Sequence, residues 1–190
     1  HFRLNHLSEV QDSPEEAFDR MKALGATFCM PHQCITDALV DRRDRVIRDL
    51  DRYTKLIRER EMIPGLSTHM PESPIYADET GLDVAGYIQI YNAAGFLMQI
   101  EIDWVHRSIW QREKPVVAIK PLGAGRVPPL VGLAFSWATI RPLDMICIGC
   151  YTPDEAREVI DISRSQLEGR ASGVELQTTR SKASVMAAGG

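Results

Sequence analysis

Cysteine is scarce in this chain: its 190 residues include four, at positions 29, 34, 147 and 150. Four scattered cysteines do not make the disulfide framework of a small secreted protein, so we expect a reducing, cytoplasmic environment. No apolar signal sequence is visible in the opening residues, HFRLNHLSEVQDS. The longest apolar stretch, LVGLAFSWATI at 130–140, is too short to cross a bilayer and fits a buried helix.

An excess of basic residues is also missing. Lys and Arg number 22 against 26 Asp and Glu, which gives a formal net charge of −4. This balance favours neither nucleic acid nor an anionic membrane as a partner. A Gly-x-Gly-x-x-Gly motif does not follow the first predicted strand, which argues against a doubly wound dinucleotide-binding fold. The remaining composition, 44% hydrophobic and 25% charged, is typical of a globular domain.

Five short apolar segments, each ending in polar residues, predict five β-strands. They are 26–33 (ATFCMPHQ), 62–70 (MIPGLSTHM), 86–92 (GYIQIYN), 115–122 (PVVAIKPL) and 145–150 (MICIGC). Near-continuous apolar runs of this kind are typical of parallel strands, which are covered on both faces. The pattern therefore indicates a parallel sheet.

Segments with helical spacing or helix-capping residues alternate with these strands. Helices are predicted from the Ser13-Pro14 cap to Gly25, over 41–61, over 97–113, over 130–141, and from the Thr152-Pro153 cap onward. Glu61 stands at a helix end where glycine is the usual residue.

Strands that alternate with helices predict an α/β fold, and a TIM-type (β/α)8 barrel fits best. Such a barrel has eight strands and takes roughly 250 residues. We therefore expect residues 1–168 to form about five βα units from the C-terminal part of a barrel, or a short version of one. Residues 169–190 are expected to form a tail, either a short helix or disordered. Unpaired strand edges would then favour association of several copies.

Cys147 and Cys150 have the C-x-x-C spacing of redox dithiols and zinc knuckles. Residues three apart on a strand point to opposite faces, so the two thiols would converge only if the strand broke between them. Buried cysteine behaves as a small hydrophobic residue. The sequence therefore predicts a buried core strand, with Gly149 in a tight turn before the next helix.

Polar residues at the predicted strand ends indicate a functional rim, because barrel enzymes carry their chemistry at the C-terminal ends of the strands. His32 could be a general acid or a metal ligand, or simply a hydrogen-bonded histidine. His69 has the same options, with the structural one favoured. Lys120 could hold a phosphate or carboxylate, or pair with a neighbouring acid. The loop PLGAG at 121–125 could bring backbone N–H groups close to a pyrophosphate.

In chain order, these strand ends resemble strands four to eight of the aldo-keto reductase superfamily. GATFCMPH is similar to the fourth strand, which ends in the family's catalytic histidine. GLSTH and YIQIYN resemble the fifth and sixth strands. VVAIKPLGAG is similar to the seventh strand with its pyrophosphate loop, and ICIGCYTPDEAREVI resembles the closing segment. The resemblance covers residues from about 24 to 165.

This resemblance implies hydride transfer between a nicotinamide cofactor, NADP or NAD, and a small-molecule carbonyl substrate. It implies that His32 is catalytic and polarises the carbonyl oxygen, and that Ser67, Thr68 and Gln89 contact the nicotinamide carboxamide. The contacts to the pyrophosphate and adenosine would come from Lys120, Pro121, Leu122, Gly123, Gly125, Gly149, Thr152 and Glu158. The family's catalytic Asp, Tyr and Lys belong to its second and third strands, which have no counterpart among the five segments.

Two alternatives stay open. His32 and His69 lie on adjacent predicted strand ends and could bind a divalent metal for hydrolysis or isomerisation, with Asp37 as the nearest carboxylate. The chain could also be a non-catalytic relative that keeps the barrel scaffold.

Overall fold

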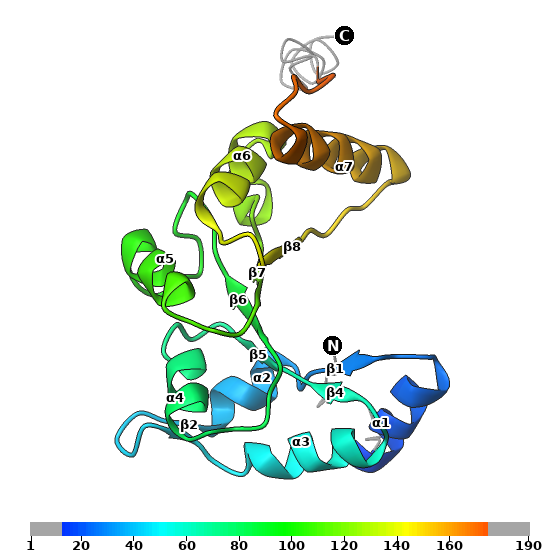
Figure 1. The fold of residues 1–190 in the computed structure, drawn as a ribbon, viewed down its shortest axis with the longest axis vertical. Helices are drawn as coiled ribbons and strands as arrows, with labels where there is room; N and C mark the ends of the chain where they lie inside the picture. The colour runs from blue at the N-terminus through cyan, green and yellow to red at the C-terminus, as the bar shows by residue number, and fades with distance from the viewer. Residues whose placement is uncertain (1–12, 175–190) are drawn as a thin grey trace, which may run out of the picture.

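A computed structural model describes residues 13–174 of the chain (Figure 1). The helices are α1 (Pro14–Ala23), α2 (Gln33–Thr36), α3 (Leu50–Glu59), α4 (Ser73–Glu79), α5 (Ile102–Trp110), α6 (Pro129–Thr139) and α7 (Pro153–Glu168), with short 3-10 turns η1 (Asp37–Leu39) and η2 (Gly123–Gly125). The strands are β1 (Phe28–Cys29), β2 (Val40–Asp41), β3 (Val46–Ile47), β4 (Ile63–Pro64), β5 (Leu66–Thr68), β6 (Tyr87–Ile90), β7 (Val116–Ile119) and β8 (Met145–Cys147). Among these residues no helix is both long and apolar enough to cross a membrane.

The predicted alternation of strands and helices around a parallel sheet is confirmed. β5, β6, β7 and β8 form a four-stranded parallel sheet in chain order, and β1 pairs in parallel with β4. Each of the five segments predicted to be strands contains a β-strand, and Gly65 divides the second segment into β4 and β5. Figure 1 shows the strands running through the middle of the molecule, with α4 and α5 along one side.

The register gives the two faces of the sheet different surroundings. Tyr87 lies beside Val116, and Ala118 lies beside Ile146. The side chains of Tyr87, Val116 and Ala118 are buried, and Ile146 packs against hydrophobic clusters that include residues of α6 and α7. This face of the sheet is therefore the one that the helices cover. On the opposite face Met145 is 48% exposed. The core of the protein therefore lies between the sheet and the helices.

The prediction of a buried core strand at 145–150 is wrong. β8 forms, but Cys147 and Cys150 are both exposed free thiols. β8 is the last strand of the described sheet and pairs with β7 alone. The face of β8 that carries Met145 and Cys147 is exposed to solvent. Whether a strand is buried depends on the elements that pack over it, which the strand's own residues do not reveal.

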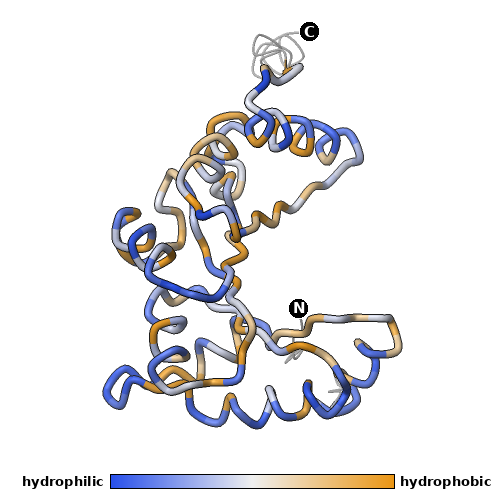
Figure 2. Tube along the Cα trace, in the orientation of Figure 1, coloured by the Kyte–Doolittle hydropathy of each residue, from blue (hydrophilic) through white to orange (hydrophobic). Residues whose placement is uncertain are grey.

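The helix predicted over 41–61 begins nine residues later, at Leu50. The preceding residues form an antiparallel hairpin in which β2 pairs with β3. The Asp41 carboxylate closes its turn by accepting the backbone N–H groups of Arg43 at 2.9 Å and Asp44 at 3.1 Å. Such side-chain bonds to the backbone compete with helix formation. The rest of the segment, α3, is the largely hydrophilic helix of Figure 2 and buries Leu50 and Ile57.

The helix predicted over 97–113 also starts late, at Ile102. Asn92 is fully buried, and its Oδ1 accepts the backbone N–H groups of Ala94 at 3.2 Å and Phe96 at 2.9 Å. This arrangement holds the chain after β6 in a loop. Leu97 then adopts a φ of 58°, in the left-handed region, which a helix does not contain.

The other predicted helix boundaries are close to the observed ones. The Ser13 hydroxyl caps α1 and the Thr152 hydroxyl caps α7, as their patterns predict. Glu61 has a φ of 55°, so it does take the backbone position that usually falls to glycine. α7 ends at Glu168 with Gly169 as its C-cap, and the part of the predicted tail beyond residue 174 lies outside the described residues.

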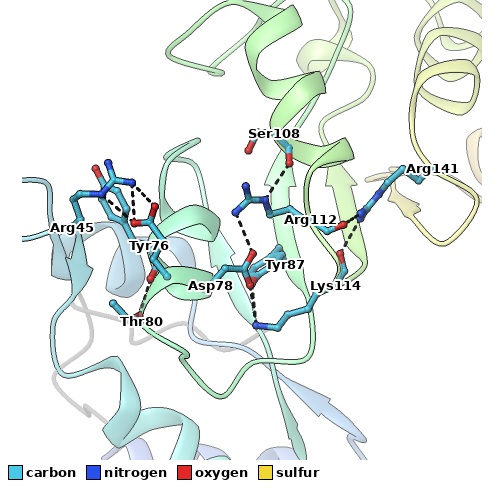
Figure 3. A network of polar contacts seen from close by, with 10 residues as sticks. Arg45, Tyr76, Asp78, Thr80, Tyr87, Ser108, Arg112, Lys114 and Arg141 are labelled. Atoms are coloured by element: carbon cyan, nitrogen blue, oxygen red, sulfur yellow. Dashed lines mark hydrogen bonds and ion pairs between the residues drawn. The ribbon is translucent and has the colours of Figure 1, made fainter.

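A polar network joins the elements at the N-terminal edge of the sheet (Figure 3). Asp78 on α4 accepts hydrogen bonds from the Tyr87 hydroxyl, from Lys114 Nζ at 3.0 Å and from Arg112 Nη1 at 3.1 Å. Burial raises the pKa of Asp78, but the hydrogen bonds from Tyr87 and Lys114 outweigh it and leave the pKa lowered. Arg141 continues the network through the backbone carbonyl of Lys114 at 2.8 Å. This edge of the sheet is therefore fixed by charge-assisted bonds.

Candidate functional site

A cavity of about 660 Å³ lies at the C-terminal ends of β7 and β8 and is called here the β7–β8 pocket. One wall follows β7 and runs to the start of α6, and the other follows β8 and runs into the first turns of α7. The lining residues are Ile119 to Leu122, Ala124 to Pro129, Cys147 to Cys150, Glu155, Glu158 and Val159. In a parallel sheet this edge is where ligands bind.

The pocket brings together most of the residues expected to contact pyrophosphate and adenosine. Those that line it are Lys120, Pro121, Leu122, Gly125, Gly149 and Glu158. Gly123 lies in the same loop but is buried. Thr152 does not line the pocket, because its exposed side chain caps α7 and accepts the backbone N–H of Glu155 at 3.2 Å.

The loop after β7 has an unusual backbone. Lys120 and Ala124 adopt φ values of 58° and 55°, which are costly for residues with a Cβ, and Gly125 has a φ of 84°. A Cβ added at Gly125 or at Gly149 would meet no atom within 4 Å. Glycine lets a ligand approach the main chain closely, and strained backbone is enriched at ligand sites.

The two walls of the pocket carry opposite charges. Lys120 and Arg126 stand on the β7 wall, and Glu155 and Glu158 stand on the α7 wall. The Arg126 guanidinium lies 4.0 Å from the centroid of the Phe96 ring. Its Nη1 also donates to the Gly123 carbonyl at 3.1 Å. Sequence reasoning missed Arg126, although its position directly after the glycine loop was a usable signal.

His32 lies at the N-terminus of α2 and is half-buried. Its Nδ1 accepts the backbone N–H of Cys34 at 3.2 Å and lies 3.1 Å from Cys34 Sγ. Because Nδ1 acts as an acceptor, the neutral ring carries its proton on Nε2. This is the form that can donate a hydrogen bond to a carbonyl oxygen.

Thr68, expected to contact a carboxamide, is instead fully buried within the protein. Its hydroxyl donates to Asp37 Oδ1, and its Oγ1 accepts the backbone N–H of Met70 at 2.9 Å. Asp37 Oδ2 also accepts the backbone N–H of His69 at 3.1 Å. Burial raises the pKa of Asp37, although these hydrogen bonds act in the opposite direction. Asp37 thus fixes the chain after β5, a role that its spacing from His32 did not reveal.

Ser67 and Gln89 are both buried but are not brought together. Thr68 pairs with Gln89 across β5 and β6, and Ser67 pairs with Ile88. Paired residues of parallel strands share a face, and successive residues alternate between faces. Ser67 and Gln89 therefore point to opposite faces of the sheet, so they do not form one joint contact to a carboxamide in this structure.

His69 is linked electrostatically to the pocket. Burial lowers the pKa of His69, and the positive charge of Lys120 lowers it further. The neutral imidazole is therefore the favoured form in the folded protein at neutral pH. Since the unfolded chain binds the proton more readily, this site makes the protein less stable as the pH falls below about 6.5.

We expect Lys120→Met to raise the pKa of His69, because it removes the nearby positive charge, while burial still keeps that pKa below its ordinary value. The His69 Cε1–H resonance, followed by NMR between pH 4 and 9, measures this change. Lys55→Met on α3 is the control, since Lys55 pairs with Asp51 at 3.1 Å and is not among the groups that shift His69. An unchanged His69 titration in Lys120→Met would show that the two groups are not coupled.

The alternative hypothesis of a divalent-metal site has no set of ligands in this part of the chain. Between residues 13 and 174, no group of three or more His, Cys, Asp or Glu side chains is placed to hold a metal ion. Comparison with protein-family models, with curated proteins and with solved structures gave no match. The geometry of the β7–β8 pocket and of His32 therefore carries the functional argument.

Proposed function

We propose that this chain is part of a TIM-type (β/α)8 barrel that binds a nicotinamide dinucleotide, as in aldo-keto reductase-type oxidoreductases. The observation that carries the proposal is the β7–β8 pocket. It gathers six residues that the resemblance assigns to the cofactor, from the segments that follow β7 and β8, two strands about 30 residues apart in the sequence. The C-terminal ends of neighbouring parallel strands lie at the same edge of the sheet. The volume of the pocket is in the range usual for small-molecule sites.

The pocket fits one half of such a cofactor better than the other. Lys120, Arg126 and the glycine loop supply the cations and open backbone that a pyrophosphate requires. The nicotinamide half has less support, since Ser67 and Gln89 point to opposite faces. We therefore assign the pyrophosphate and adenosine to the β7–β8 pocket.

In the proposed reaction the bound cofactor supplies a hydride to a small-molecule carbonyl. His32 donates a hydrogen bond from Nε2–H to the carbonyl oxygen, which stabilises the negative charge that develops there. The oxygen then takes up a proton from solvent water to complete the alcohol. The Cys34 backbone N–H holds the ring in this orientation through Nδ1. Lys120 and Arg126 hold the phosphates, which is positioning rather than proton transfer.

Calorimetric titration with ADP-ribose and with nicotinamide mononucleotide tests the two halves separately. We expect saturable binding of ADP-ribose and weaker or undetectable binding of the mononucleotide. Lys120→Met should weaken ADP-ribose binding about tenfold, because it removes one of the two cations of the pocket. Lys55→Met, with the same charge change on α3, should leave it unchanged.

Circular dichroism of each sample shows whether it is folded. Failure of a folded wild-type sample to bind ADP-ribose would contradict the cofactor assignment. Equal weakening by Lys120→Met and Lys55→Met would show that binding responds only to net charge and would remove the pocket from the proposal.

A further inference from the structure

We propose that Cys147 and Cys150 make the β7–β8 pocket a thiol-modification site, where a low-molecular-weight disulfide that carries carboxylates forms a mixed disulfide with the protein. Oxidised glutathione is the chemical model of such a reagent. The proposed function uses neither thiol. The modification site stands on the geometry of the pocket itself, and only its effect on ADP-ribose binding rests on the proposed function.

Both thiols are accessible, and both line the same cavity. Cys147 and Cys150 are exposed free cysteines on the wall of the 660 Å³ pocket. Cys147 is the last residue of β8 and pairs with Ile119, the last residue of β7. Cys150 lies beyond the end of β8, just before α7. A small disulfide that enters the pocket therefore meets nucleophilic sulfur at the strand end and again at the approach to α7.

The other two cysteines lie in different surroundings. Cys29 is buried in the hydrophobic core, and burial raises the pKa of its thiol, which leaves less of the reactive thiolate at neutral pH. Cys34 is half-buried against the same hydrophobic cluster, and its Sγ lies 3.1 Å from His32 Nδ1. Neither is among the residues that line the pocket. The chain therefore contains its own comparison between thiols inside and outside the pocket.

The basic wall of the pocket supplies partners for carboxylates. Lys120 directly follows the β7 residue that pairs with Cys147. Arg126 is held on two sides, by the Phe96 ring at 4.0 Å and by the Gly123 carbonyl at 3.1 Å. A guanidinium restrained in this way loses little side-chain freedom when it binds a carboxylate. These two cations hold an anionic disulfide close to the thiols.

The mixed disulfide forms by thiol–disulfide exchange, which needs no further oxidant. The cysteine thiol loses its proton to water, and the thiolate attacks one sulfur of oxidised glutathione. A new S–S bond forms as the S–S bond of the reagent breaks. The departing sulfur leaves with the electron pair and takes up a proton from water. The cysteine is thereby oxidised and the departing glutathione is reduced, and a tripeptide is left in the pocket.

Incubation of the full chain with oxidised glutathione, followed by intact mass measurement and peptide mapping, tests the site. We expect one glutathionyl group per chain, on Cys147 or Cys150, because the first group fills the pocket. The double variant Cys147→Ser, Cys150→Ser should react about tenfold more slowly or less, whereas Cys34→Ser should react like the wild type. Circular dichroism verifies that each variant is folded. Reaction of the double variant at the wild-type rate, or equally fast reaction at Cys34, would overturn the inference.

Lys120→Met distinguishes recognition in the pocket from simple exposure of the thiols. It should slow the reaction with oxidised glutathione about fivefold, because it removes one of the two cations. It should not slow the reaction with cystamine, a disulfide whose ends are ammonium groups. Lys55→Met, with the same charge change on α3, should leave both rates unchanged. Equal slowing with the two reagents would overturn the recognition of carboxylates.

The modified protein should lose its binding of ADP-ribose, and reduction with dithiothreitol should restore it, because the tripeptide occupies the same cavity. Unchanged binding after complete modification would overturn the placement of the thiols beside the ligand. The proposed function can also fail separately. If the unmodified, folded protein binds no ADP-ribose while its two pocket thiols react as expected, the cofactor assignment fails and the modification site stands.

Discussion

Replacing Asp144 with alanine is expected to lower the free energy of unfolding by about 3–5 kcal/mol, because it leaves a buried positive charge without its partner. The Asp144 carboxylate is fully buried, and the side chain of Arg141 is 6% exposed. Asp144 Oδ1 accepts from Arg141 Nη2 at 2.6 Å, and Oδ2 accepts from Arg141 Nε at 2.9 Å. The fork of the guanidinium thus matches the carboxylate with two parallel bonds.

The pair also connects three segments at the N-terminal edge of the sheet. Asp144 Oδ1 accepts the backbone N–H of Val116 at 2.8 Å, at the start of β7. Arg141 donates to the backbone carbonyls of Arg112 and Lys114, in the turn between α5 and β7. Loss of the carboxylate therefore strands a main-chain donor as well as a cation, and both costs add to the destabilisation.

Urea unfolding followed by circular dichroism measures the change, and Asp154→Ala is its control. Asp154 also pairs with an arginine three residues away, Arg157, but these side chains are 91% and 76% exposed. An exposed pair contributes little, so we expect no appreciable loss of stability there. A loss in Asp144→Ala as small as that in Asp154→Ala would show that the buried pair does not hold the strand ends together.

Much of the fold could be predicted because its signals are local. The capping groups of Ser13 and Thr152 mark the starts of α1 and α7, and each acts through residues within three positions of itself. The five apolar segments identified the strands for a similar reason. Parallel order then followed from the helices between them, since parallel neighbours require crossover connections.

The starts of α3 and α5 were misplaced because a single polar side chain overrode the hydrophobic pattern before each helix. Val46 and Ile47 fit the spacing of the following helix, yet Asp41 binds the backbone two and three residues ahead and turns the chain into a hairpin. Asn92 has the same effect before α5. Asp and Asn are common enough outside such turns that their presence alone does not mark one.

In the candidate site, too, some features could be predicted from the sequence and others could not. The resemblance assigns Lys120 and Gly149 to contacts with the same cofactor, and both residues line one pocket. Whether Ser67 and Gln89 share a face depends instead on the register between β5 and β6, and a shift of one residue reverses it. The exposure of Cys147 depends on what covers β8, which the sequence of the strand does not encode.

Gly132→Ala is expected both to destabilise the protein and to weaken binding in the β7–β8 pocket. A Cβ at this position would lie 2.6 Å from the Pro121 carbonyl oxygen and 3.1 Å from Leu122 Cδ2. Helix propensity alone would make alanine more favourable than glycine in α6 by about 1 kcal/mol, so any destabilisation comes from the clash. The clash is with main chain, which cannot move aside as a flexible side chain would. Either α6 or the loop that carries Lys120 must therefore shift.

We expect Gly132→Ala to lower the free energy of unfolding by about 1–3 kcal/mol, in the range typical of overpacked cores. The same shift should weaken ADP-ribose binding about tenfold or more, because a small displacement of positioning groups is costly for a bound anion. Gly149→Ala is the control for stability, since its Cβ would meet no atom within 4 Å and its φ is not in the left-handed region. Normal stability and binding in Gly132→Ala would show that the contact between α6 and the loop is not tight, and the pocket wall would then not depend on it.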